Sequence, residues 1–208
     1  ALERKEFRLH YQPKFSTSDG VVVGAEALLR WQHPVRGIIA PADFIGLAEK
    51  TGLIVPIGEW VLDEACRQMR KWYDEGYQQW KMAVNLSSVQ FSNDNLVQMV
   101  RETLARNNLP ATSLMLEVTE STAMHNVEAS LTILEQLVKL GVEISIDDFG
   151  TGYSSLLYLK RLPATELKID RGFIRDLAQG TDDASIVSAI VALGRSLNLR
   201  IVAEGVET

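Results

Sequence analysis

Two patterns of hydrophobic and polar positions alternate along the chain, one typical of strands and one typical of helices. Short runs rich in β-branched residues are typical of strands, and longer stretches with apolar residues three and four positions apart are typical of helices. The runs predict strands over residues 7–15, 21–30, 82–85, 114–119, 142–147, 167–170 and 200–203. The longer stretches predict helices over residues 41–50, 56–73, 93–106, 127–140, 153–160 and 183–197.

The order of these elements predicts the fold class. A polar turn over residues 16–20 joins the first two strands, so we expect an antiparallel hairpin. From there on strands and helices alternate, which indicates parallel βαβ units. We therefore predict an α/β chain of the TIM-like (β/α)8 barrel class, not a doubly wound sheet. Such a barrel needs about 250 residues, and this chain stops after its seventh barrel strand, so the eighth strand and helix are expected to be missing.

Composition narrows the class of protein. Hydrophobic residues make up 46% and charged residues 23%, as in a folded globular domain. The net charge of -6 argues against binding DNA through phosphate neutralisation. Cys66 is the single cysteine, which excludes an internal disulfide and suits a reducing compartment.

The ends of the chain suggest a piece of a longer protein. No apolar run approaches the roughly 20 residues of a membrane span, and the charged N-terminus does not resemble a leader. We expect residues 1–6 to be a linker or the end of an upstream helix, and residues 7–208 to form one domain. The domain is expected in the cytoplasm, and membrane anchoring of the parent protein stays open.

Acidic and amide residues follow the apolar runs. They are Glu26, Asn85, Glu117, Asp147 with Asp148, Asp170 and Glu204. In a parallel barrel the strand ends meet at one rim, which carries the active site. Several carboxylates at one rim need a compensating charge, and oxygen ligands favour Mg²⁺ or Mn²⁺ over Zn²⁺. We predict a site for one or two such cations.

Lys168 lies between two of these acidic positions and indicates phosphoryl chemistry. One or two divalent cations can activate a water and stabilise the leaving oxygen, and Lys168 could face a phosphoryl oxygen or orient the water. The absence of a Gly-x-x-x-x-Gly-Lys loop argues against P-loop hydrolysis. Simpler interpretations are a solvated Lys168 and an Asp147-Asp148 pair that caps a helix.

An ordered set of motifs resembles the EAL family of cyclic di-GMP phosphodiesterases. The tripeptide Glu26-Ala27-Leu28 alone occurs in many helices, whereas the ordered set is specific. The set comprises Tyr11-Gln12-Pro13, Glu26-Ala27-Leu28-Leu29-Arg30-Trp31, Pro41-Ala42-Asp43-Phe44-Ile45, Asn85-Leu86-Ser87, Glu117-Val118-Thr119-Glu120, Asp147-Asp148-Phe149-Gly150-Thr151-Gly152-Tyr153-Ser154-Ser155, Leu167-Lys168-Ile169-Asp170 and Ala203-Glu204-Gly205-Val206-Glu207.

The resemblance implies a barrel with an antiparallel first strand and hydrolysis of cyclic di-GMP to linear pGpG. The implied metal ligands are Glu26, Asn85, Glu117 and Asp147, with Asp148 serving a second cation and Asp170 close by. The implied catalytic residues are Glu26, Lys168 and Glu204. Whether Glu204 is a general base or only orients the attacking hydroxide stays open. The implied nucleotide contacts are Gln12, Leu28 and Arg30.

The resemblance also implies partners. The loop from Asp148 to Ser155 would link the metals to contacts in a homodimer, and Glu120 would hold that loop. The parent protein would carry an upstream sensory or GGDEF-type domain. Two alternatives are a receptor that binds cyclic di-GMP without cleaving it and a scaffold that only dimerises. The complete set of site residues favours the enzyme.

Overall fold

A computed structural model describes residues 1–151, 156–175 and 182–206. The chain forms two compact units. The first comprises Ala1–Leu116 and Leu140–Val142, and the second comprises Glu117–Lys139 and Glu143–Thr208. No helix of the described residues is long and apolar enough to cross a bilayer.

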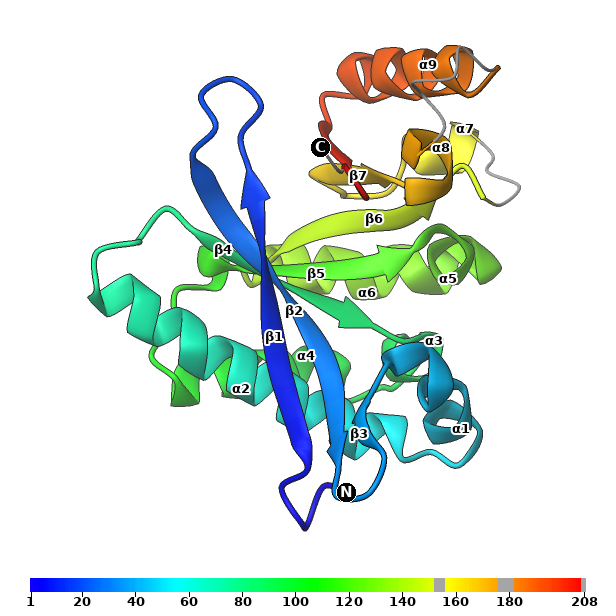
Figure 1. The fold of residues 1–208 in the computed structure, drawn as a ribbon. Coiled ribbons are helices and arrows are strands. Elements are labelled where there is room, and N and C mark those ends of the chain that lie inside the picture. The colour runs from blue at the N-terminus through cyan, green and yellow to red at the C-terminus, as the bar shows by residue number, and fades with distance from the viewer. Residues whose placement is uncertain (152–155, 176–181, 207–208) are drawn as a thin grey trace. The chain divides into compact units, whose positions relative to one another are not determined.

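The first unit is built on an antiparallel hairpin that continues into a parallel pair. Strand β1 (Phe7–Phe15) pairs antiparallel with β2 (Val22–His33), and β2 pairs parallel with β4 (Lys81–Leu86). The short β3 (Gly37–Ile39) also pairs with β2. Figure 1 shows the long β1–β2 hairpin crossing this unit. The predicted hairpin is therefore confirmed.

Helix α2 (Ile54–Asp74) covers the strands of the first unit, packing on β1, β2 and β4. Its apolar stripe is buried because residues three and four apart share one helix face. The other helical segments of this unit are the 3₁₀ turns Pro41–Asp43 and Ala111–Ser113, α1 (Ile45–Lys50), α3 (Ser88–Phe91) and α4 (Leu96–Arg106).

The second unit contains three parallel strands in the order β6 (Glu143–Phe149), β7 (Glu166–Ile169) and β8 (Arg200–Ala203). Strand β5 (Leu114–Thr119) ends in this unit with residues 117–119. Helix α9 (Asp182–Ser196) packs on β7 and β8, as Figure 1 illustrates. The remaining helices are α5 (Glu120–His125), α6 (Val127–Lys139), α7 (Leu156–Leu159) and α8 (Arg171–Arg175).

Strands were predicted more accurately than short helices. All seven predicted strands are present, and Gly141 ends α6 with a φ of 97° as a C-terminal glycine should. Helices α3, α5 and α8 were missed, because four to six residues show too little of a helical repeat. The predicted helix 41–50 is divided into a 3₁₀ turn and α1, and residues 153–155 of the predicted helix 153–160 lie outside the described residues.

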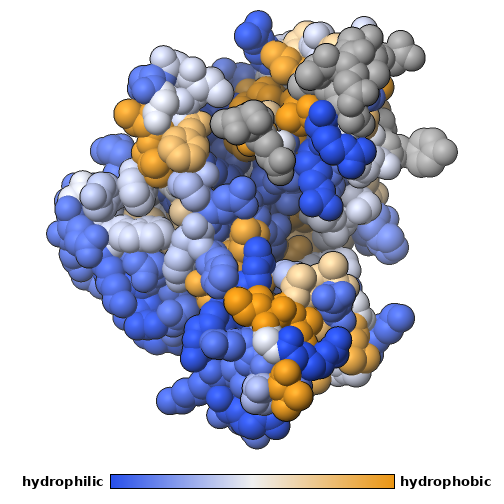
Figure 2. All heavy atoms as spheres, in the orientation of Figure 1, coloured by the Kyte–Doolittle hydropathy of each residue, from blue (hydrophilic) through white to orange (hydrophobic). Residues whose placement is uncertain are grey.

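The surface is mostly hydrophilic with some large apolar side chains exposed, as Figure 2 shows for one face. In the first unit the exposed apolar side chains include Val35, Ile38 and Leu47. Apolar atoms form a large share of any folded protein surface, so scattered side chains of this kind do not by themselves identify a site.

Candidate active site

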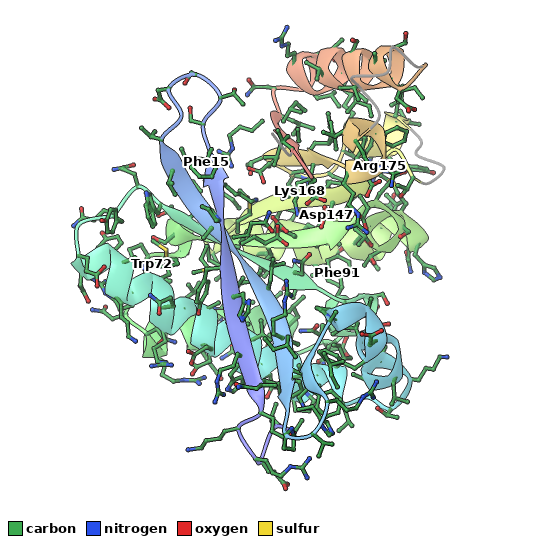
Figure 3. The ribbon with its side chains drawn as sticks, in the orientation of Figure 1. Phe15, Trp72, Phe91, Asp147, Lys168 and Arg175 are labelled. Atoms are coloured by element: carbon green, nitrogen blue, oxygen red, sulfur yellow. The ribbon has the colours of Figure 1, made fainter. Side chains whose placement is uncertain are left out.

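A buried lysine surrounded by carboxylates lies at the centre of the second unit. Lys168 on β7 is 1% exposed, and its Nζ lies 2.8 Å from Glu117 Oε2 and 3.2 Å from Asp147 Oδ2. The same Nζ lies 2.6 Å from Glu204 Oε1. Figure 3 labels Asp147 and Lys168, which come from the adjacent strands β6 and β7. Four residues predicted as site residues are therefore in direct contact.

A β-bulge brings two consecutive aspartates to this cluster. Ile146 pairs with Leu167 and Phe149 pairs with Ile169, so Asp147 and Asp148 together lie opposite Lys168. An extra residue of this kind bends the strand and re-aims its side chains. Asp148 takes a φ of 53°, which non-glycine residues rarely adopt. The bulge allows both carboxylates to approach the site, although neighbours in a regular strand point to opposite faces.

The cluster has the chemistry of a site for a hard cation. Carboxylate oxygens of Asp147, Asp148 and Glu204 lie within 4.8 Å of one another. Burial raises the pKa of Asp148, and the neighbouring Asp147 and Asp170 raise it further. Burial also raises the pKa of Glu204, an effect that the hydrogen bond from Lys168 opposes. A bound cation would favour the charged form of both carboxyls, so these residues fit a divalent ion.

Asp170 lies beyond the strand and outside this group of three carboxylates. Its Oδ1 accepts a hydrogen bond of 2.8 Å from the backbone N–H of Gly172 in α8. After burial and Asp147, its charge is a further cause of the raised pKa of Asp148. Asp170 thus contributes negative potential to the cluster and also orders the start of α8.

The turn after the bulge is held at Gly150 by a hydrogen bond and is closely packed there. The buried carboxylate of Glu120 accepts a hydrogen bond of 2.9 Å from the Gly150 N–H. A Cβ at Gly150 would lie 2.9 Å from Cε2 of Phe173 in α8. Phe173 was not expected from the sequence, because no spacing rule connects it to Gly150. The Glu120 hydrogen bond holds the backbone that follows Asp148, and the Phe173 ring leaves no room for a side chain at Gly150.

Replacing Gly150 with alanine is expected to lower the free energy of unfolding by about 1–3 kcal/mol, as strained backbone positions do. Gly150 has a φ of 99°, and the added methyl would also meet the Phe173 ring. Urea denaturation measures the change. Gly20→Ala is the matched control, because Gly20 has a φ of 70° and no atom within 4 Å of the added Cβ. Equal losses in both variants would contradict a role for the Phe173 contact.

The first unit holds a second group of predicted residues. Asn85 on β4 donates a hydrogen bond of 2.7 Å from Nδ2 to Glu26 Oε1 on β2. Gln12 lies opposite Glu26 in the antiparallel register. Leu28 and Arg30 follow Glu26 at alternate positions, so all of them share one face of the hairpin. The structure thus brings together the predicted nucleotide contacts and two predicted metal ligands.

The expectation that the polar residues mark strand ends is wrong for Glu26, Asn85, Glu117 and Asp147. Glu26 is the fifth of twelve residues in β2, and Asn85 precedes the last residue of β4. Strand β5 continues two residues beyond Glu117, and β6 continues two residues beyond Asp147. A polar side chain that has a partner does not interrupt the backbone ladder, so these strands continue past it. Glu204, in contrast, follows β8 directly as expected.

A cavity of about 480 Å³ in the first unit has different chemistry. It is lined by apolar side chains and by Arg70, Arg101 and Asn108, and contains none of the predicted site residues. Arg70 already pairs with Asp74, and Arg101 Nη1 donates to Gln98 Oε1. The carboxylate cluster therefore remains the better candidate for catalysis.

The antiparallel first strand and the parallel strands that follow it define an α/β protein of the TIM-like barrel class, and the carboxylate cluster is its candidate cation site. The chain belongs to the EAL domain family, whose pattern matches residues 1–208. The resemblance read from the motifs is therefore confirmed, and so is the fold class.

Several known proteins are similar to this chain. The bifunctional diguanylate cyclase/cyclic di-GMP phosphodiesterase MucR of Pseudomonas aeruginosa is 68% identical over 208 residues, which is 100% of this chain and 30% of MucR. The cyclic di-GMP phosphodiesterase PdeR of Escherichia coli is 43% identical over 208 residues, covering 100% of this chain and 31% of PdeR. The chain thus spans about a third of the length of these relatives.

Solved structures agree with the family. The PaMucR phosphodiesterase in complex with c-di-GMP matches with a TM-score of 0.98 and 68% identity, covering 100% of this chain and 84% of that chain. The FimX EAL domain of Pseudomonas aeruginosa bound to c-di-GMP matches with a TM-score of 0.89 and 27% identity, covering 100% and 83%. Both similarities extend over the whole of this chain.

Proposed function

We propose that this chain hydrolyses one phosphodiester of cyclic di-GMP and releases linear pGpG, with Mg²⁺ or Mn²⁺ as its cofactor. The observation that carries the proposal is the buried Lys168 ammonium in contact with Glu117, Asp147 and Glu204. Relatives with phosphodiesterase names support the substrate, among them MucR and PdeR.

The proposed metal ligands are those implied by the family. They are Glu26, Asn85, Glu117, Asp147 and Asp148, with Asp170 close by. All of these ligands would donate oxygen atoms, which hard divalent cations prefer. The proximity of Asp147, Asp148 and Glu204 also supports such a cation. When bound, the cation supplies Lewis acidity toward the phosphodiester.

The side chains of the chain account for the remaining steps. Lys168 keeps a positive charge beside the carboxylates and can donate to a phosphoryl oxygen or to the attacking water. The water oxygen bonds to phosphorus, the bond from phosphorus to the 3′ oxygen breaks, and a proton ends on that 3′ oxygen. Glu204, whose pKa is raised by burial, accepts the proton of the water or orients the water. Arg30, Gln12 and Leu28 contact the nucleotide.

The assay that tests this function follows cyclic di-GMP with Mg²⁺ or Mn²⁺ by chromatography. We expect pGpG to appear, and none to appear with EDTA. Binding measured by calorimetry, with no product under either metal, would favour the receptor that binds without cleaving. A C-terminally longer polypeptide belongs in the same assay, because we also propose that further residues close the barrel.

Calcium is expected to inhibit turnover. Ca²⁺ prefers more ligands and longer bonds than Mg²⁺, so it would occupy the carboxylates without the octahedral geometry. Rates measured with Mg²⁺ and increasing Ca²⁺ should fall toward zero, and excess Mg²⁺ should restore them. Undiminished turnover in Ca²⁺ alone would contradict the proposed geometry.

We further propose that the protein acts as a homodimer through the loop from Asp148 to Ser155, and that an upstream sensory or GGDEF-type domain precedes it in the parent. The predicted loop lies partly outside the described residues, which end at residue 151 and resume at residue 156. The length of the relatives supports additional domains, since the chain covers 30% of MucR. Light scattering of the purified chain tests the dimer.

A further inference from the structure

A single buried glutamine fixes the backbone directly after β4. Gln90 in α3 is 6% exposed, and its Oε1 accepts hydrogen bonds from Ser87 N–H at 3.3 Å and from Ser87 Oγ–H at 3.0 Å. The Gln90 N–H donates back to Ser87 Oγ at 3.2 Å. This reciprocal arrangement is a capping box, for which Ser-x-x-Gln is the sequence signal.

Helix α2 has a glycine, Gly58, where it packs against this glutamine. A Cβ at Gly58 would lie 1.7 Å from Gln90 Nε2 and 2.4 Å from Gln90 Cδ. Glycine inside a helix is unfavourable relative to alanine, and Gly58 has no positive φ that would require it. The space taken by the Gln90 amide is therefore the physical reason for glycine at this position.

The strand end held by Gln90 carries a proposed metal ligand. Asn85 lies two residues before Ser87, and β4 ends at Leu86 between them. The side chain of Asn85 is exposed, and its Nδ2 donates to Glu26 Oε1 at 2.7 Å. Because Asn85 is next to the last residue of the strand, its direction depends on how the following backbone is anchored.

We infer that Gln90 is a positioning residue for Asn85 and acts through Ser87. Position 58 is glycine because the Gln90 amide occupies the space that a Cβ would take there. The inference rests on the proposed function, in which Asn85 is a metal ligand. Residues behind metal ligands orient them, and their loss lowers metal affinity or activity by about 10–100-fold. A cap that only stabilised α3 would change stability and leave metal affinity unchanged.

The test uses Gln90→Leu, Gly58→Ala and the double variant. Gly46→Ala in α1 is the matched control, because an added Cβ there meets no atom within 4 Å. Calorimetry with Mn²⁺ alone measures metal affinity, and thermal melting measures stability. An NMR spectrum follows the side-chain N–H₂ signals of Asn85, assigned by their loss in Asn85→Ala.

We expect Mn²⁺ to bind about 10–100-fold more weakly to both single variants. The double variant should bind Mn²⁺ no more weakly than either single variant, because both substitutions disrupt the same contact of the Gln90 amide with Ser87. The Asn85 side-chain signals should shift in all three, whereas Gly46→Ala should match the wild type in every measurement.

The inference would be overturned if Gln90→Leu melted at a lower temperature but kept wild-type Mn²⁺ affinity and unshifted Asn85 signals. Failure of the proposed function gives a different result. In that case the wild type neither binds Mn²⁺ nor releases pGpG, and the Asn85 signals alone decide whether Gln90 positions this side chain.

Discussion

Replacing Lys168 with methionine is expected to destabilise the protein by about 3–5 kcal/mol when no divalent cation is present, as loss of one member of a buried ion pair does. Methionine keeps most of the length and apolar volume of lysine but lacks the ammonium. The Lys168 and Glu117 side chains are 1% and 0% exposed, so water cannot replace the lost charge easily. The remaining carboxylates would repel one another without it.

Magnesium should restore much of this loss, because a bound cation supplies the missing positive charge. A ligand at 100 times its dissociation constant stabilises the folded state by about 2.7 kcal/mol. Urea unfolding followed by circular dichroism, with EDTA and with saturating Mg²⁺, measures both effects. Circular dichroism is preferred because Trp31, Trp60, Trp72 and Trp80 all lie in the first unit.

The loss of stability in Lys168→Met should also depend on pH. The pKa of Glu204 is already raised above its ordinary value of 4.5 by burial, and removing Lys168 takes away a hydrogen bond that lowers it. A carboxyl with a raised folded pKa binds more protons in the folded state, so stability falls as pH rises from 4.5 through that raised pKa. The variant should therefore lie closest to the wild type at acidic pH.

Lys160→Met controls for the substitution itself, since Lys160 is exposed in the same unit. It should change stability little at any pH or Mg²⁺ concentration. If Lys168→Met were as stable as Lys160→Met in EDTA, the buried ammonium would not be needed to compensate the carboxylates.

The chemistry of the site could be predicted because it depends on residue types in sequence order. The position of Asp147 and Glu117 beside apolar runs is sufficient to identify them as candidate ligands of a cation. The bulge could not be predicted, because register against β7 decides that Asp147 and Asp148 both lie opposite Lys168. Nor did the sequence indicate that Lys168 is buried, since the same residue could have been solvated.

Tertiary packing explains the other features that could not be predicted from the sequence. Strand β3 has three residues, too few for an alternating pattern, and it forms by pairing with β2. Phe173 and Gly150 are distant in sequence and meet only when α8 packs beside the bulge. Contacts of this kind depend on the folded arrangement of the unit, whereas the hairpin could be predicted from local turn chemistry.

Replacing Glu26 with glutamine is expected to remove activity without disturbing the fold. The new amide oxygen can still accept the hydrogen bond that Asn85 Nδ2 donates to Glu26 Oε1 at 2.7 Å. The melting temperature should therefore stay within about 2 °C of the wild type. The negative charge is lost, so a cation bound there would lose one anionic ligand.

Turnover of cyclic di-GMP should fall by at least about 100-fold in Glu26→Gln, since even residues behind the metal ligands account for about 10–100-fold. Mn²⁺ affinity measured by calorimetry should fall in parallel, because the same carboxylate would serve binding and catalysis. Glu59→Gln is the control, an exposed glutamate on α2 that should keep full activity. Wild-type turnover in Glu26→Gln would exclude Glu26 as a metal ligand, and a loss of activity with unchanged Mn²⁺ affinity would assign its charge to the substrate instead.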